Sequence, residues 1–249
     1  MYRQLSVVLV VPVLDEAGKI GEVVRRAPRA IVDEVVVVDD GSTDGSREEA
    51  AAGGANVIEL GSTQGVGAAL RIGFEHVLAS GADAAVVAAG NNKDAPEEIP
   101  TLLDPIADDR ADLVQGSRFL SAGASLGDMP GYRRVAVRLH SHLFSRLAGC
   151  RVTDSTNGFR AIRTSVLRDP NLELDRSWLD AYELEPYLLL RAIKLGYRFL
   201  EAPVTKVYPD RALGQTKMRP VVDWWSILRP LAVAAIGGER LSRRYYSKG

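Results

Sequence analysis

The chain alternates between short apolar runs and segments in which apolar residues recur at helical spacing. Apolar runs rich in valine predict buried strands at residues 6–13, 34–39, 56–60 and 84–89. The segments that follow each run predict helices at residues 17–27, 46–52, 65–80 and 97–106. Strands and helices in this order predict a parallel sheet with helices on both faces.

Beyond residue 112 the pattern loosens into loops, amphipathic helices and isolated strands such as residues 198–204. We see no internal repeat, low-complexity segment or linker. We therefore predict a single α/β domain over residues 1–220, with a regular half at 1–110 and a second half at 111–220. Residues 221–249 are expected to form a C-terminal amphipathic helix and a basic tail.

Composition narrows the class of protein. With 249 residues, 46% hydrophobic and 25% charged, the chain has the make-up of an ordinary soluble globular domain. The net charge of −1 provides no basic field, so we expect no nucleic-acid partner. The single Cys150 excludes an internal disulfide and suits the cytoplasm. No apolar stretch approaches the roughly 20 residues that span a bilayer, so we expect at most peripheral contact with the inner face of the membrane.

Polar residues cluster after three of the predicted strands. Glu16 follows the first strand, Asp39 and Asp40 end the second, and Asn91 and Lys93 follow the fourth. In sheets of this kind, ligands bind beyond the carboxyl ends of the strands. Carboxylates there can accept hydrogen bonds from ring N–H groups and sugar hydroxyls. The alternative is that these residues only build turns and cap helices.

Several segments together resemble a known family. These are PVLDEAGKIGEVV, VVVVDDGSTDGS, GVGAALRIGF and AAGNNKDAPEEIP, followed by DLVQGSRF, VTDSTNGFRAIRTSVL and LGYRFLEAPVTKVYPDRALGQTKM. The set resembles inverting family 2 glycosyltransferases with the GT-A fold, and within them the dolichyl-phosphate mannose and glucose synthases. The resemblance implies that residues 1–110 bind the nucleotide sugar and residues 111–220 the acceptor.

The resemblance also implies roles for individual residues. The nucleotide-sugar site would comprise Pro12, Leu14, Glu16, Asp39, Asp40, Gly67, Arg71, Gly90, Asn91 and Lys93. The catalytic residues would be Arg118, Asp154, Arg211 and Lys217. Arg133 and Ser155 would meet the acceptor phosphate. Arg160 is a further candidate for that contact, because it follows Gly158 in a turn of the kind that faces phosphate. Arginines suit that role because their planar fork binds phosphate with two hydrogen bonds, although Arg160 could instead brace the core.

The turn after the fourth strand departs from the family. Relatives carry an Asp-x-Asp motif there that binds Mg²⁺ or Mn²⁺ through oxygen, but the two positions are Ala89 and Asn91 in this chain. We hypothesise that the Lys93 ammonium partly replaces the cation. Asn91 and Asp94 remain the alternative metal ligands, and Asp94 could instead anchor Lys93 or cap a helix. A substitution that merely disabled the enzyme is the competing interpretation.

The resemblance thus predicts transfer of a hexose from a UDP- or GDP-type sugar to a phosphate-bearing acceptor, either polyprenyl phosphate or a soluble phosphorylated small molecule. Transfer to a hydroxyl group, or sugar-nucleotide binding without catalysis, are the alternatives. The C-terminal segment, with Trp224, Trp225 and Leu228 beside basic residues, suits either contact with anionic lipid or packing on the domain. We favour packing. The sequence does not indicate an oligomeric state.

Overall fold

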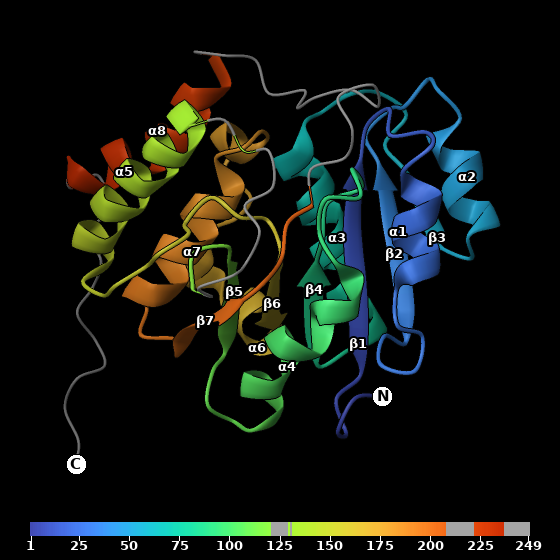
Figure 1. Ribbon diagram of the computed structural model, residues 1–249, viewed down its shortest axis with the longest axis horizontal. Helices are drawn as coiled ribbons and strands as arrows, with labels where there is room; N and C mark the ends of the chain where they lie inside the picture. The colour runs from blue at the N-terminus through green and yellow to red at the C-terminus, as the bar shows by residue number, and fades with distance from the viewer. Residues whose placement is uncertain (121–128, 130, 208–221, 237–249) are drawn as a thin grey trace.

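The computed structural model describes residues 1–120, 129, 131–207 and 222–236. Within them, one mixed sheet has the strand order β3-β2-β1-β4-β6-β5-β7 (Figure 1). The strands are β1 (Val7–Val13), β2 (Glu34–Asp39), β3 (Asn56–Glu59), β4 (Ala84–Val87), β5 (Leu113–Ser117), β6 (Arg160–Arg163) and β7 (Phe199–Pro203). This arrangement confirms the predicted single α/β domain with a mostly parallel sheet.

Helices cover both faces of the sheet. One face carries α1 (Ile20–Arg26), α2 (Ser46–Ala52) and α4 (Ile99–Ala107), the last preceded by a 3-10 turn at Pro96–Glu98. The other carries α3 (Val66–Ser80), α5 (Gly131–Ala148), α6 (Thr164–Leu167), α7 (Leu184–Lys194) and α8 (Val222–Ala235). Successive residues of β1 pack into opposite cores, Val8 and Val10 into one, Leu9 and Val11 into the other. A strand buried on both faces is therefore apolar throughout, as its sequence indicated.

The elements of the first half lie where the sequence predicted them, with ends shifted by a few residues. The largest shift is at α1, which begins at Ile20 because Asp15 and Gly18 take positive φ angles of 48° and 76° and keep the preceding residues in a turn. The second half adds β6, which runs antiparallel to both β4 and β5. The chain returns from α5 to the carboxyl end of β5 before β6 starts, so β6 can only run in the opposite direction.

The C-terminal helix α8 lies beside α5 and α7 at one edge of the molecule (Figure 1). Leu231 of α8 is buried in the core on that side, and Leu228 packs against the same core. Among the described residues, no helix is both long enough and apolar enough to cross a bilayer. The division of residues 1–220 into two functional halves stays a prediction.

Candidate active site

The loops after β1 and β2 are joined into one rigid rim at the carboxyl edge of the sheet. Ser42 Oγ accepts a hydrogen bond of 2.9 Å from the Asp15 amide, and the Asp15 carboxylate accepts one of 2.8 Å from the Thr43 amide. Ser46 Oγ accepts from the Glu16 amide at 2.7 Å. Glu16 itself forms an ion pair of 2.8 Å with Lys19. These contacts place the predicted residues Pro12, Leu14 and Glu16 beside the end of β2.

The two aspartates that end β2 are buried and bind backbone amides. The Asp39 carboxylate accepts from the Ser42 amide at 3.1 and 3.2 Å. Asp40 accepts from the amides of Gln64 at 2.6 Å and Gly65 at 2.9 Å, which fixes the loop leading into α3. In this structure both carboxylates therefore stabilise turns, which is the alternative role that the sequence left open. Their contact with a base or ribose stays a prediction.

The start of α3 is closed by another part of the chain. The amides of Gly67 and Ala68 donate to the Asp180 carbonyl at 2.8 and 3.1 Å. A Cβ on Gly67 would lie 1.9 Å from the Leu179 carbonyl oxygen, so only glycine allows this approach. Arg71 forms an ion pair with the Asp180 carboxylate. Here the glycine is required by packing, and the diphosphate contacts predicted for Gly67 and Arg71 remain predictions.

The turn after β4 is tight and its polar groups serve the fold. A Cβ on Gly90 would come within 2.6 Å of the Val13 side chain, so this turn lies directly against the end of β1. Asn91 Oδ1 accepts from the Lys93 amide at 3.2 Å. Asp94 is buried; its Oδ2 accepts from the Ala89 amide at 3.1 Å and its Oδ1 binds the Lys206 ammonium at 2.9 Å.

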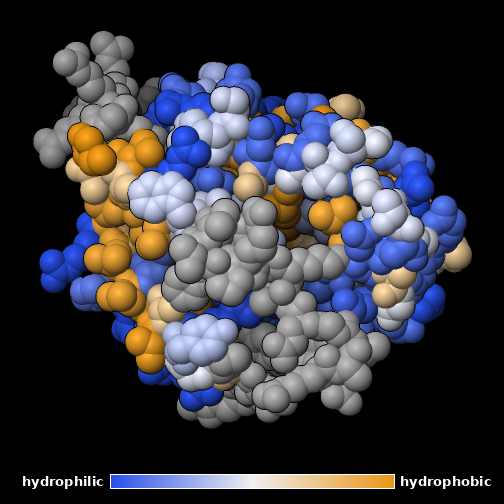
Figure 2. All heavy atoms as spheres, turned by 90° about the horizontal axis from the view of Figure 1, so that it is seen from above, coloured by the Kyte–Doolittle hydropathy of each residue, from blue (hydrophilic) through white to orange (hydrophobic). Residues whose placement is uncertain are grey.

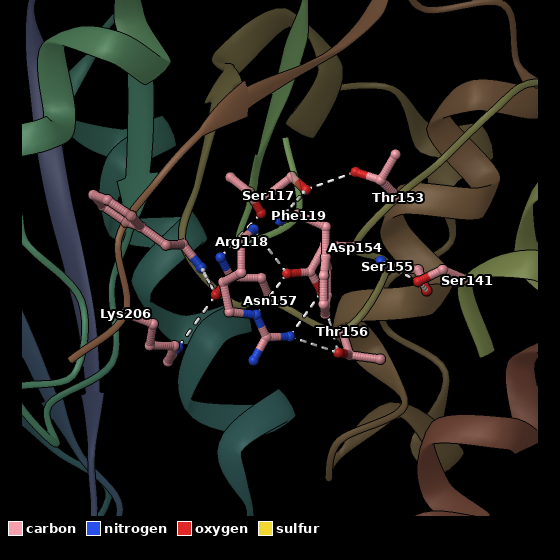
Figure 3. Close-up of polar contacts among 12 residues, drawn as sticks. Ser117, Arg118, Phe119, Ser141, Thr153, Asp154, Ser155, Thr156, Asn157 and Lys206 are labelled. Atoms are coloured by element: carbon pink, nitrogen blue, oxygen red, sulfur yellow. Dashed lines mark hydrogen bonds and ion pairs between the residues drawn. The ribbon is translucent and has the colours of Figure 1, made fainter. Parts of the chain in front are cut away.

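Lys206 comes from the segment after β7, which pairs with this turn. The Val207 amide donates to the Lys93 carbonyl at 2.8 Å, and Asp94 and Lys206 form an antiparallel bridge. The Lys206 ammonium also donates to Asn157 Oδ1 at 3.2 Å (Figure 3). Burial, and then the charges of Lys206 and Arg133, lower the pKa of the neighbouring Lys93. Two lysines thus meet at the end of β4.

The residues of this turn do not fit a divalent metal. Both oxygens of Asp94 are engaged, one by an ammonium, and the Asn91 oxygen closes its own turn. Mg²⁺ and Mn²⁺ require several oxygen ligands, preferably carboxylates. Within the part of the chain that the structure describes, no three His, Cys, Asp or Glu side chains are grouped to hold a metal ion. The donor set therefore argues against the metal role considered for Asn91 and Asp94.

Arg118 and Asp154 form a buried pair just beyond the end of β5 (Figure 3). Arg118 Nε donates to one carboxylate oxygen at 2.6 Å and Nη2 to the other at 2.7 Å, while the Arg118 amide adds a third hydrogen bond at 3.2 Å. The side chains are only 7% and 0% exposed. A bidentate pair in this setting fixes the plane of the guanidinium. The structure thus brings these two predicted catalytic residues together, with Asp154 as the partner that orients Arg118.

The other predicted residues are placed differently. Ser155 is buried and hydrogen bonded to His140 at 2.7 Å and Ser141 at 3.0 Å, both on α5. Arg160 binds the carbonyls of Asn157 and Glu185 and pairs with the Glu185 carboxylate at 3.1 Å, so it braces the core. Arg133 lies at the start of α5, near enough to Lys93 to affect it. A phosphate role for these three stays a prediction. Arg211 and Lys217 lie outside the described residues.

Two residues that support the site were missed by the sequence analysis. Lys206 was quoted within a motif but given no role, because its partners Asp94 and Asn157 are far away in the sequence. Glu201 accepts hydrogen bonds of 2.9 Å from the Thr153 and Asp154 amides and so holds the turn that carries Asp154. Burial raises the pKa of the Glu201 carboxyl. The pattern of apolar and polar residues in and after β7 gave no sign of either contact.

Comparison with known proteins gives consistent matches over most of the chain. The chain is 33% identical over 220 residues to polyprenol monophosphomannose synthase from Mycolicibacterium smegmatis, covering 84% of this chain and 80% of that one. It is 31% identical to undecaprenyl-phosphate mannosyltransferase from Micrococcus luteus, with coverages of 86% and 88%. It is 35% identical to dolichyl-phosphate hexose transferase from Haloferax volcanii, with 74% of each chain covered.

A solved structure supports the fold. Glucosyl-3-phosphoglycerate synthase from Mycobacterium tuberculosis, solved with Mn²⁺, UDP and phosphoglyceric acid, matches with a TM-score of 0.68 at 20% identity, covering 99% of this chain and 82% of that one. At this identity the match shows the fold alone, and that fold is the GT-A architecture expected from the resemblance. The family model described as glycosyl transferase family 2 matches residues 8–169. The chain belongs to glycosyl transferase family 2.

Proposed function

We propose that this protein is an inverting glycosyltransferase that moves a hexose from a nucleoside-diphosphate sugar to a phosphate-bearing acceptor. The observation that carries the proposal is the concentration of cations at one edge of the sheet, where Lys93, Lys206 and Arg133 gather and Arg118 is fixed close by. It matches a reaction in which both donor and acceptor carry phosphate.

The chemistry needs no strong base. One oxygen of the acceptor phosphate attacks the anomeric carbon, the bond from that carbon to the donor β-phosphate breaks, and the nucleoside diphosphate leaves with the electron pair. Attack from the face opposite the leaving group inverts the configuration at that carbon. A phosphate is already ionised, so the protein has to orient it and to neutralise the charge of the leaving group. Arg118 suits the first task and Lys93 the second.

The buried Asp154 carboxylate acts through Arg118 in this account. Its oxygens accept from Arg118 Nε and Nη2, so it fixes the guanidinium where the acceptor phosphate arrives. The donor's base and ribose would lie against the rim made by the loops after β1 and β2, near Leu14, Asp39 and Asp40. The relatives in Mycolicibacterium smegmatis and Micrococcus luteus, named for mannose, support a hexose as the transferred sugar.

The surface beside the site favours a lipid-linked acceptor. Exposed apolar residues form a stripe along α5, namely Tyr132, Val135, Leu139 and Leu143, which are 72%, 68%, 59% and 43% exposed. Trp225 of α8 and Ile236, which directly follows that helix, are exposed as well. Figure 2 shows hydrophobic surface along the side of the molecule where α5 and α8 lie. Apolar helix surface next to arginines suits the interface of an anionic membrane, so we place the enzyme at the inner face of the membrane with polyprenyl phosphate as acceptor.

The test is a transfer assay. Purified protein is incubated with GDP-mannose, UDP-glucose or UDP-N-acetylglucosamine and with either polyprenyl phosphate in detergent or 3-phosphoglycerate. Mass spectrometry identifies the glycosylated acceptor, and NMR of the anomeric proton gives its configuration. We expect one donor to yield an inverted glycosyl polyprenyl phosphate. A product on phosphoglycerate alone would move the acceptor to a soluble molecule, and binding of the nucleotide with no product on any acceptor would favour a non-catalytic protein.

A further inference from the structure

The end of β4 holds an arrangement of charge that neither a metal site nor a simple turn requires. Two lysines stand on paired segments there, Lys93 on the turn after β4 and Lys206 on the segment after β7. Lys206 is 12% exposed and Asp94, its partner, 2% exposed. Taking a lysine ammonium out of water is costly unless it is paired, so the fold holds Lys206 at this place through Asp94 and Asn157.

The charge balance of the cluster is positive. The side chains that act on Lys93, together with the partner of Lys206, are Lys19, Lys206, Arg133, Glu16 and Asp94. The strongest charge effects on the Lys93 ammonium come from three cations, Lys206, Arg133 and Lys19, and from one carboxylate, Glu16. The Asp94 carboxylate already pairs with Lys206. Positive charges held together in this way are stabilised when an anion binds among them.

We propose that the ammonium groups of Lys93 and Lys206 hold the donor diphosphate directly, so that this chain binds its nucleotide sugar without a divalent cation. The inference rests on the proposed function and adds two statements to it, namely that Lys206 binds the donor and that donor binding needs no divalent cation. Lys206 becomes a donor-binding residue, fixed by Asp94, and Lys93 neutralises the leaving diphosphate as the bond to the sugar breaks. Arg133, at the start of α5, adds a further positive charge that acts on Lys93.

The experiment measures the binding of UDP and GDP by calorimetry to the full chain, first in excess EDTA and then with Mn²⁺ or Mg²⁺. We expect one of the two nucleotides to bind in EDTA and its Kd to stay unchanged when metal is added. Lys93→Met should weaken binding by about 10-fold to 100-fold, the usual effect of losing a hydrogen bond to a charged group. Lys194→Met, a lysine at the far end of α7, is the matched control and should bind like the wild type.

Lys206 needs a paired substitution, since Lys206→Met alone would leave the buried Asp94 without its cation. In the double variant Asp94→Asn with Lys206→Met, the amide can still accept from the Ala89 amide and no charge is stranded. This variant should keep the melting temperature near that of the wild type while losing affinity to a similar extent as Lys93→Met. If the double variant melts normally and binds nucleotide as tightly as the wild type, Lys206 is not a donor-binding residue.

The outcomes separate the inference from the proposed function. Nucleotide binding that requires Mn²⁺ would overturn the inference and leave the glycosyltransferase assignment intact. Wild-type affinity in Lys93→Met under EDTA would overturn it as well. If neither nucleotide binds with or without metal, both the inference and the proposed function fail.

Discussion

Asp154→Asn is the sharpest single test of the catalytic centre. The substitution keeps the shape of the side chain but removes the charge that receives Arg118 Nε at 2.6 Å and Nη2 at 2.7 Å. It leaves a guanidinium that is only 7% exposed facing an amide group that cannot accept both bonds. Removing one partner of a buried ion pair typically costs about 3–5 kcal/mol.

The loss can be measured directly. For a domain of this size, about 2–4 °C of melting temperature accompanies each kcal/mol, so the midpoint should fall by about 6–20 °C. Urea unfolding followed by circular dichroism gives the free energy itself. The double variant Asp154→Asn with Arg118→Met should recover part of the loss, because no unpaired cation remains. Thr156→Ala, which removes a hydrogen bond of 3.0 Å to Arg118, is the control and should cost about 1 kcal/mol.

The account would be refuted if Asp154→Asn were as stable as the wild type. That result would mean that Arg118 has no need of this carboxylate and that Asp154 is not what fixes the guanidinium. If Asp154→Asn folds at low temperature, we expect a lower rate of transfer with donor affinity unchanged, because Arg118 would no longer meet the acceptor phosphate in a fixed orientation.

Three further predictions concern other parts of the molecule. Gly67→Ala should lower the free energy of unfolding in urea by about 1–3 kcal/mol or more, because the new Cβ would collide with the Leu179 carbonyl. Gly131→Ala is the control and should leave the free energy of unfolding unchanged, because a Cβ there meets open space. Leu139→Glu with Leu143→Glu should reduce binding to liposomes of anionic lipid without changing nucleotide affinity, and unchanged sedimentation with the liposomes would contradict the membrane surface. Burial lowers the pKa of His140, so as the pH falls the unfolded chain binds a proton at this histidine at a higher pH than the folded chain does. The contribution of His140 to stability should therefore be complete above the unfolded pKa of about 6.5 and decrease below it, by at most about 1.4 kcal/mol per pH unit. The substitution His140→Gln should flatten this pH dependence.

The regular half of the fold was predictable because its signals are local. The valine-rich strands are buried on both faces, so their central positions are all apolar and the run is visible in the sequence alone. The helix at Val66–Ser80 was visible from its periodicity and from the glycines that open it. The reversed strand Arg160–Arg163 was not predictable, because its direction depends on the path of the chain after α5.

The sequence predicted where polar residues lie but not which contacts they make. Polar residues do follow the strands at their carboxyl ends, and Arg118 and Asp154 are paired, while their catalytic role stays a prediction. The sequence could not show that the Asp40 carboxylate accepts hydrogen bonds from the Gln64 and Gly65 amides. Nor could it show that Lys206 would reach Asp94, because that contact joins residues 112 positions apart. Long-range pairs of this kind leave no periodic trace in a single sequence.

The central claim is that nucleotide-sugar cleavage is coupled to a phosphate acceptor. The most direct measurement follows release of the nucleoside diphosphate over time, with and without polyprenyl phosphate, beside the amount of glycosyl phosphate formed. The account predicts that release depends on the acceptor and that the two products appear in equal amounts. Release at the same rate without acceptor, or none with any donor that binds, would contradict it.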